Sequence, residues 1–163
     1  MPRKFFKRWL PDSTTLRNTP GLKSVAHLLD NPSLFQLNRR SVAVAFFVGL
    51  FFCYMPTPGQ ALLAALGAFS LRANLPIAVA LVWVSNPFTL PFFVLSAYGA
   101  GAFFLGGGSI QMPAEFNFAW FLTVWKPFLL GSLIMGAAAG AAGYVLVNII
   151  WRVSVWRRWS TRL

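Results

Sequence analysis

Long apolar runs and short polar interruptions alternate along the chain from residue 41 to residue 151. The apolar runs in the first part of this tract are residues 41–54, 61–71, 75–84 and 92–105. Two of the interruptions contain prolines, and these are Pro56-Thr57-Pro58-Gly59-Gln60 and Asn86-Pro87-Phe88-Thr89-Leu90-Pro91. The runs predict helices, and the prolines predict breaks in them, because proline lacks an N–H and clashes with the preceding helical turn.

The runs beside the interruptions are too short to cross a bilayer alone. A helix rises 1.5 Å per residue, so residues 61–71 span about 16 Å, roughly half of a hydrocarbon core. Arg72-Ala73-Asn74 follows them, and its charge predicts a turn at a membrane interface or in a wet cavity. The runs are arranged almost symmetrically about Ala73, which predicts two broken helices joined by a tight hairpin. In transporters, such breaks point to binding sites.

The second part of the tract predicts a loop, an interfacial segment and a final span. Residues 106–117 form the loop, whereas residues 118–125 are aromatic and end at Lys126-Pro127. Residues 128–151 then run for 24 positions without a charge, which is long enough to cross a bilayer with some tilt. We therefore expect an all-α, polytopic helical membrane protein with three to four membrane segments, its helices broken or re-entrant at the two proline motifs.

Composition supports a membrane domain between two basic flanks. The chain has 163 residues, of which 57% are hydrophobic and 10% charged, and its mean hydropathy of +0.63 does not suit a soluble globule. Residues 1–40 are a basic amphipathic lead-in, residues 41–151 the helical membrane domain, and residues 152–163 a basic cytoplasmic tail. Polar residues 11–15 follow the first basic cluster, so no cleaved signal peptide is expected.

The net charge of +11 is concentrated at the two ends of the chain. Under the positive-inside rule both termini are drawn to the cytoplasm, where the anionic head groups of the lipid bilayer attract them. Nucleic-acid binding would use the same charges, but the aromatic residues beside them favour a membrane interface, and we expect no nucleic-acid partner. These aromatic residues are Phe5, Phe6, Trp9, Trp151, Trp156 and Trp159.

Cytoplasmic ends require an even number of crossings, whereas two broken helices and one final span give three. Either residues 118–125 contribute to a further pass, or a pair of half-length segments is re-entrant and returns to its own side. The sequence leaves both alternatives open. We expect cytoplasmic ends with partly re-entrant segments.

The proline motifs combine neutral hydrogen-bonding side chains with backbone groups that proline leaves without partners. The candidate substrate-site or helix-break residues are Pro56, Thr57, Pro58, Gly59, Gln60, Arg72, Asn86, Pro87, Thr89 and Pro91. If the motifs face one another, their polar groups converge in one wet pocket, and Arg72 can receive a phosphate or carboxylate. The alternatives are an interfacial turn before Gln60, a helix capped by Ser85 or Asn86, and an Arg72 that reaches the membrane surface.

The final span carries a row of small residues. Ser132, Gly136 and Gly140 recur every four residues and give one face that another helix backbone can approach closely. This face predicts tight packing within the chain or, alternatively, contact between copies in a homo-oligomer.

Residues suited to catalysis or to holding a cofactor are scarce. His27 is the sole histidine and Cys53 the sole cysteine, and the acidic residues are Asp12, Asp30 and Glu115. No metal-ligand spacing, acid–base pair or phosphate-binding loop is visible. We therefore expect no enzymatic activity, no metal and no cofactor.

The paired motifs resemble the signature of a bacterial inner-membrane family, domain of unknown function 2062. The resemblance rests on Pro56-x-Pro58-Gly59-Gln60 followed by Asn86-Pro87-x-Thr89-x-x-Pro91 and extends over residues 20–155. It implies a small polytopic protein of the inner membrane of Gram-negative bacteria, without an established activity. Relatives are sometimes fused to glycosyltransferase domains, which implies a link to lipid-linked sugars or their carriers.

Two functions are consistent with the sequence. In the first, the protein transports or handles a lipid-linked or small amphiphilic substrate at a mid-membrane polar site lined by Thr57, Gln60, Asn86 and Thr89. In the second, it is a non-catalytic structural or assembly protein that acts through helix–helix contacts. The first function predicts a wet cavity that joins both breaks, and the second predicts a dry core with an exposed small-residue face.

Overall fold

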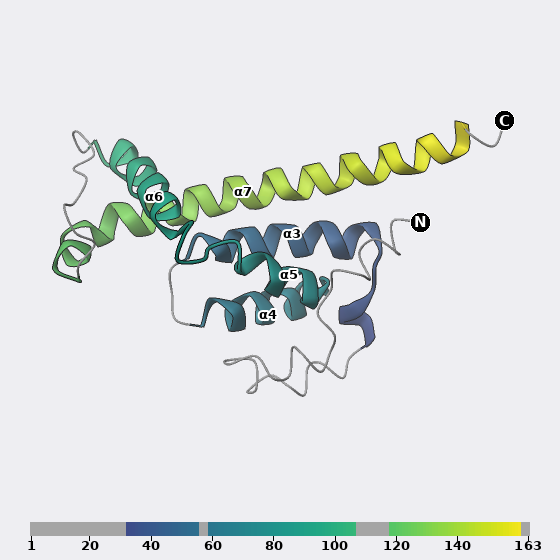
Figure 1. The fold of residues 1–163 in the computed structure, drawn as a ribbon, viewed down its shortest axis with the longest axis horizontal. Helices are drawn as coiled ribbons and strands as arrows, with labels where there is room; N and C mark the ends of the chain where they lie inside the picture. Colours follow the sequence, from purple (N-terminus) through teal and green to yellow (C-terminus); the bar gives the residue numbers. More distant parts are fainter. Residues whose placement is uncertain (1–31, 56–58, 107–117, 161–163) are drawn as a thin grey trace.

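Helices are the only regular secondary structure among the residues that the structure describes. The computed structural model describes residues 32–55, 59–106 and 118–160. Its elements in chain order are η2 (Pro32–Phe35), α3 (Arg39–Cys53), α4 (Gln60–Ser70), α5 (Leu75–Val82), α6 (Leu90–Phe104) and α7 (Phe118–Ser160) (Figure 1). Within these ranges there is no strand, and the all-α prediction is confirmed.

Helix α3 begins at a side-chain cap. Asn38 has extended backbone angles, and its Oδ1 accepts a hydrogen bond from the Ser41 N–H at 2.7 Å. Asparagine is favoured at this position because its side chain satisfies an N–H that the first helical turn leaves without a partner. The helix then runs for 15 residues, about 22 Å, and ends at Cys53, just before the first proline motif.

The chain reverses direction between the end of α3 and the start of α4. Gly59 has a φ of 89°, a left-handed angle that glycine tolerates, and α4 begins at the next residue. After α4, the chain is back at the start of α3, where the Asn74 N–H donates to the Ser41 carbonyl at 3.2 Å. Helix α4 is therefore antiparallel to α3. The expected broken helix is instead two helices side by side, because the alanine-rich face of α4 packs onto α3.

Helix α5 runs in the same direction as α3. Its first turn lies near the start of α3, and Gly49 of α3 packs against its second half, since a Cβ at Gly49 would lie 2.6 Å from the Leu81 Cβ. Helices α3, α4 and α5 form a three-helix unit. The turn at Arg72 lies at the end where α3 starts, and both proline motifs follow helices that run away from that end.

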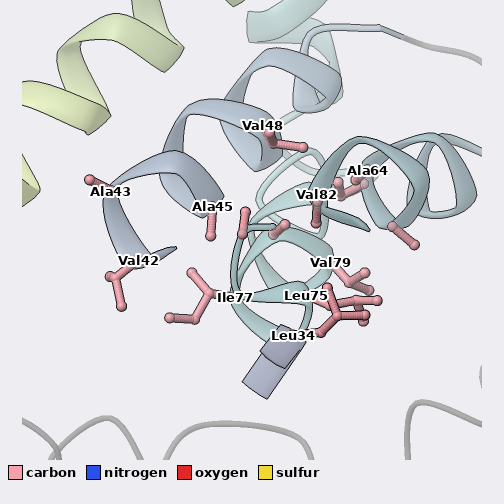
Figure 2. Packing of buried hydrophobic residues seen from close by; sticks show 14 of the residues in the cluster. Leu34, Val42, Ala43, Ala45, Val48, Ala64, Leu75, Ile77, Val79 and Val82 are labelled. Atoms are coloured by element: carbon pink, nitrogen blue, oxygen red, sulfur yellow. The ribbon is translucent and has the colours of Figure 1, made fainter. Parts of the chain in front are cut away.

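Alanine and branched apolar side chains fill the interior of the three-helix unit. Buried residues gather there from α3, α4, α5 and the short η2 (Figure 2). They include Leu34, Val42, Ala45, Val48, Ala64, Ala68, Leu75, Ile77, Ala78, Val79 and Val82. Short isolated helices are marginal, so the two half-length helices α4 and α5 depend on this packing for their stability.

Helix α7 is the longest element, with 43 residues and a length of about 64 Å. It passes through Pro127, so the interfacial segment and the final span that the sequence predicts separately belong to one helix. It also continues to Ser160, beyond the start of the predicted tail at residue 152. Its segment Trp125–Arg157 is long and apolar enough to cross a membrane, and 22% of the most apolar window is buried.

The other described helices are shorter than a membrane span. Helices α3 to α6 have 15 residues or fewer, so one described helix is long enough to cross a membrane, and the prediction of three to four membrane segments is not confirmed. Large apolar side chains are nevertheless exposed on α6 and α7. Examples are Phe92, Phe103, Leu129, Leu146 and Ile150.

Helix α7 runs antiparallel to α3 and contacts it through glycines. A Cβ at Gly136 would lie 2.9 Å from the Phe51 carbonyl oxygen, and a Cβ at Gly140 would lie 2.8 Å from that of Phe47. Later residues of α7 thus meet earlier residues of α3, and Trp151 packs against the core of the three-helix unit. The basic end of α7 consequently extends past the start of α3 (Figure 1).

Helix α6 crosses α7 at a contact between backbones (Figure 1). A Cβ at Gly101 would overlap the Pro127 carbonyl, and a Cβ at Gly131 would overlap the Ala97 carbonyl. Only glycine allows two helices to approach this closely. Because later residues of α6 meet earlier residues of α7, α6 leads further away from the end where α3 starts.

Candidate functional site

The described part of the first proline motif consists of Gly59 and Gln60. Pro56, Thr57 and Pro58 lie outside the described residues. Gly59 is the N-cap of α4 and makes no side-chain cap, and Gln60 is the first residue of the helix. The amide of Gln60 is therefore available for contacts outside its own helix.

Gln60 connects the first break to the second. Its Nε2 donates a hydrogen bond to the Ser85 Oγ at 3.3 Å, and the Ser85 hydroxyl donates to the Val82 carbonyl at 3.1 Å. Ser85 is also beside Cys53, a buried residue at the end of α3. The two interruptions therefore meet at one polar contact between the start of α4 and the end of α5.

Asn86 and Thr89 close a tight turn of their own. The Asn86 Oδ1 accepts from the N–H groups of Phe88 at 2.9 Å and Thr89 at 3.0 Å. The Thr89 Oγ1 accepts from the Asn86 N–H at 3.0 Å and donates to the Val84 carbonyl at 2.6 Å. Both side chains thus satisfy the turn between α5 and α6, which is common for asparagine and threonine in such positions.

The second proline motif ends by starting α6. Thr89 is the N-cap of this helix without a side-chain cap, and Pro91 lies in its first turn, where the missing N–H costs little. Pro87 lies in the preceding turn and is exposed. The sequence predicts that the polar groups of the two motifs, Gln60 and Asn86 among them, converge in one pocket, whereas the hydrogen bond to Gln60 is made by Ser85. We call Gln60, Ser85, Asn86 and Thr89 the break cluster.

Arg72 lies at the other end of α4 from the break cluster. Helix α4 has 11 residues, about 16 Å, between Gln60 and this turn. Arg72 has a φ of 53°, and its N–H donates to the Phe69 carbonyl at 3.1 Å, while the Ala73 N–H donates to the Ala68 carbonyl at 2.7 Å. This bonding pattern terminates many helices, usually with glycine at the left-handed position.

A cavity of about 390 Å³ lies between the Arg72 turn and the start of α3. We call it the arginine cavity, and it is lined by Gln36, Asn38, Arg40, Ser41, Leu71 and Arg72. The buried Asn74 holds its walls together. Its Nδ2 donates to the Gln36 carbonyl at 3.2 Å, and its Oδ1 accepts from the Ile77 N–H at 3.1 Å, which caps α5.

The sequence does not predict that the Arg72 turn lies beside the start of α3. Asn38 and Asn74 each precede a helix, and the cap preference of asparagine is the signal that identifies both positions. The same preference does not reveal that the two caps lie side by side. Gln36 and Ser41 carry no such signal, because they become site residues only through the antiparallel return of α4.

The small-residue row of α7 is covered within the chain. Gly136 and Gly140 contact α3, and Ser132 is buried with its Oγ donating to the Phe128 carbonyl at 2.8 Å. This favours the first of the two predicted roles, packing within the chain. The face is not available in this arrangement for contact with another copy.

The described residues offer little for holding a metal or carrying out acid–base chemistry. No group of three histidine, cysteine, aspartate or glutamate side chains gathers within residues 32–55, 59–106 and 118–160. Asp12, Asp30 and Glu115 all fall outside these ranges. The polar groups that the structure does bring together are amides, hydroxyls and guanidinium groups.

Comparison with known proteins places the chain in one family. A sequence model of a family described as uncharacterized proteins conserved in bacteria, DUF2062, matches residues 22–160. No curated protein and no solved structure matches the chain.

Proposed function

We propose, from the premise that the chain belongs to the bacterial family DUF2062, that it is a multi-pass inner-membrane protein that handles a lipid-linked or small amphiphilic substrate. The observation that carries this proposal is the hydrogen bond from Gln60 to Ser85, 25 residues apart in the chain. It joins two proline interruptions at one end of an otherwise apolar three-helix unit. Polar backbone at membrane depth is tolerated where it is enclosed by protein or lines a water-filled site.

The helix directions support several passes with both ends on one side. Helix α3 leads away from the end marked by Arg39 and Arg40, α4 returns, α5 and α6 lead away together, and α7 returns. An even number of passes brings the basic end of α7 back to the start of α3. Positive residues favour the cytoplasmic side, so this shared end is assigned to the cytoplasm and to anionic head groups.

The half-length helices explain how the number of crossings becomes even in this proposal. Helix α4 supplies the missing return from the first break, and it reaches the cytoplasmic end at the Arg72 turn. With 15 and 11 residues, α3 and α4 are each too short to cross a bilayer, so the pair enters from the cytoplasmic end and returns to it as a re-entrant hairpin. The breaks then lie within the membrane, as a mid-membrane site requires.

The chemistry of the break cluster supports binding rather than catalysis. Gln60, Ser85, Asn86 and Thr89 are neutral and can donate and accept hydrogen bonds, but none is a strong acid or base. Phe88, 92% exposed, lies in the same turn and offers an apolar surface to a hydrocarbon chain. We therefore propose a non-enzymatic protein that needs no cofactor and binds no nucleic acid.

A structural or assembly role is the second candidate. It is favoured by the turn between α5 and α6, in which Asn86 and Thr89 direct their hydrogen bonds to backbone atoms of the turn. In that case the breaks serve only to fold the helices compactly. Contact with another protein or another copy would then use the exposed apolar faces of α6 and α7.

Substitution of Gln60 and Ser85, whose hydrogen bond connects the two breaks, distinguishes the two functions. We expect the double variant Gln60→Leu and Ser85→Ala to insert and fold but to lose complementation of a deletion strain, because the polar groups that contact the substrate are gone. The double variant loses two part-buried hydrogen bonds, Gln60 to Ser85 and Ser85 to Val82, at about 1 kcal/mol of unfolding free energy each, which a folded protein tolerates. Insertion, unfolding and complementation are measured separately.

Ser70→Ala is the matched control. The Ser70 hydroxyl donates to the Leu66 carbonyl at 2.9 Å at the other end of α4, and its loss leaves the break cluster intact. Full complementation is expected from this variant. If the double variant also complements fully while folded, the handling function is wrong and the assembly function stands.

A further inference from the structure

We propose that the arginine cavity binds a phosphate group. This inference rests on the proposed membrane function and adds to it the chemistry of the head group that the protein recognises. The site is separate from the break cluster and lies at the end of the three-helix unit where α3 starts. Its four supporting features are its size, its charge, a buried hydroxyl without a partner, and an adjoining apolar surface.

The size of the arginine cavity suits a small ligand. Its volume of about 390 Å³ lies within the range of small-molecule sites, which begins at roughly 300 Å³. The walls are fixed by hydrogen bonds from Asn74 to Gln36 and Ser41, so the cavity is formed without a ligand. A preformed site loses less entropy when the ligand binds.

The charge of the arginine cavity is positive from two directions. Arg40 comes from the first turn of α3, and Arg72 comes from the turn between α4 and α5. None of the residues that the structure describes is acidic, so no described carboxylate neutralises either guanidinium. The first turn of α3, with the positive end of its helix dipole, also lines the cavity. A guanidinium pairs well with phosphate through two parallel hydrogen bonds.

Ser41 supplies a hydrogen-bond donor that the fold does not use. Its N–H donates to Asn38 and its carbonyl accepts from Asn74, but its Oγ has no partner among the described residues. The residue lines the arginine cavity and is only 4% exposed, so water does not readily satisfy this hydroxyl. Burial of an unpaired hydroxyl is unfavourable, and because Ser41 lines the cavity, rotation of its side chain would let a phosphate oxygen there accept from the hydroxyl.

The surroundings of the arginine cavity point to an amphiphile. Leu71 is 53% exposed at its edge, and a second cavity of about 310 Å³ adjoins it. Phe35 and Leu37 line that second cavity, which shares Gln36 and Asn38 with the first. A phosphate with an attached hydrocarbon chain can therefore place its charge between the arginines and its apolar part along these side chains.

The geometry of Arg72 allows its guanidinium to be removed without harm to the fold. Its φ of 53° suits glycine better than arginine. Arg72→Gly therefore deletes one phosphate ligand while it keeps the turn. Ser41→Ala deletes the second, and because the Oγ has no partner in the fold, no described hydrogen bond is lost.

Calorimetric titration of the full-length protein in phosphatidylcholine nanodiscs tests the site with two probes. These are inorganic phosphate and short-chain phosphatidic acid. We expect Arg72→Gly to weaken binding about tenfold, as loss of a charge-assisted hydrogen bond does. Ser41→Ala is expected to weaken binding without lowering the unfolding temperature. Arg152→Gln removes an exposed charge at the same end but outside the cavity, and its affinity should stay within about twofold of wild type.

The probes also separate two sources of the phosphate. Tighter binding of phosphatidic acid identifies a lipid head group, whereas equal binding of inorganic phosphate identifies a free phosphate. Failure of both probes to bind, or an equal loss in Arg72→Gly and Arg152→Gln, overturns the phosphate site. Such a result leaves the handling function intact if the Gln60 and Ser85 variants lose complementation. If the Gln60 and Ser85 variants complement fully and phosphate binding is normal, only the handling of a substrate at the proline breaks is refuted.

Discussion

Arg72 occupies a left-handed backbone position that glycine adopts more easily. An L-residue in this region costs roughly 1–2 kcal/mol, because its Cβ approaches a carbonyl oxygen. Strained positions of this kind concentrate where a side chain has a function. Arg72 lines the arginine cavity, so in the proposed phosphate site the strained residue is also one of the ligands.

Substitution of Arg72 should therefore reveal a conflict between stability and binding. We expect Arg72→Gly to raise the unfolding free energy by about 1 kcal/mol, because the left-handed strain is relieved. Arg72→Ala removes the same guanidinium but keeps a Cβ, and it should not be more stable than wild type. Unfolding in mixed detergent micelles measures both. Equal stabilisation by glycine and alanine would contradict the account of the strain.

At this scale, the sequence identifies polar residues better than it identifies their partners. It predicts that Arg72 lies in a turn and that Gln60 belongs to an interruption, and both residues lie there. It cannot predict that Gln60 bonds to Ser85, because that contact depends on α4 returning along α3. Asn86 was assigned to a site, yet local turn geometry uses its side-chain oxygen.

The helices begin and end close to the positions that the prolines and asparagines predict. Their directions are not predictable in the same way, because a proline motif can either kink a helix or reverse the chain. The chain reverses between α3 and α4, whereas Pro127 lies inside the continuous helix α7. Packing decides between these outcomes, and packing depends on residues far away in the sequence.

The crossing of α6 and α7 depends on glycine at one point. We expect Gly131→Ala to lower the unfolding free energy by about 3 kcal/mol, the upper end of overpacking costs, because its Cβ would overlap the Ala97 carbonyl. Backbone atoms cannot move aside without separating the helices. Unfolding in detergent micelles measures the loss.

Gly67→Ala is the control for this substitution. A Cβ at Gly67 would lie 3.1 Å from side-chain atoms of Phe52 and Val48, which can adjust. The change in unfolding free energy should stay below about 1 kcal/mol, since alanine also favours the helix. If Gly131→Ala were as mild as this control, the close contact of α6 and α7 would not exist in solution.

In the whole molecule, the helix directions bring the last turns of α7 back past the start of α3. The sequence alone gives an odd number of crossings, because it treats the segments on either side of each proline motif as one broken helix. The antiparallel return of α4 changes the count. The three-helix unit therefore has one end near Arg72 and the other end near the break cluster. Helix α7 packs along α3 between these ends and contacts α6 beyond the break cluster.

Cysteine accessibility tests this arrangement most directly. Cys53 is replaced by alanine, and one cysteine is then introduced at a time, by Arg72→Cys, Arg152→Cys or Phe88→Cys. The reaction of each variant with a membrane-impermeant thiol reagent is measured. We predict that Arg72→Cys and Arg152→Cys react in inverted inner-membrane vesicles and not in intact spheroplasts, while Phe88→Cys does not react from the cytoplasmic side. Reaction of Arg72→Cys in spheroplasts, or on the side opposite to Arg152→Cys, would contradict the arrangement.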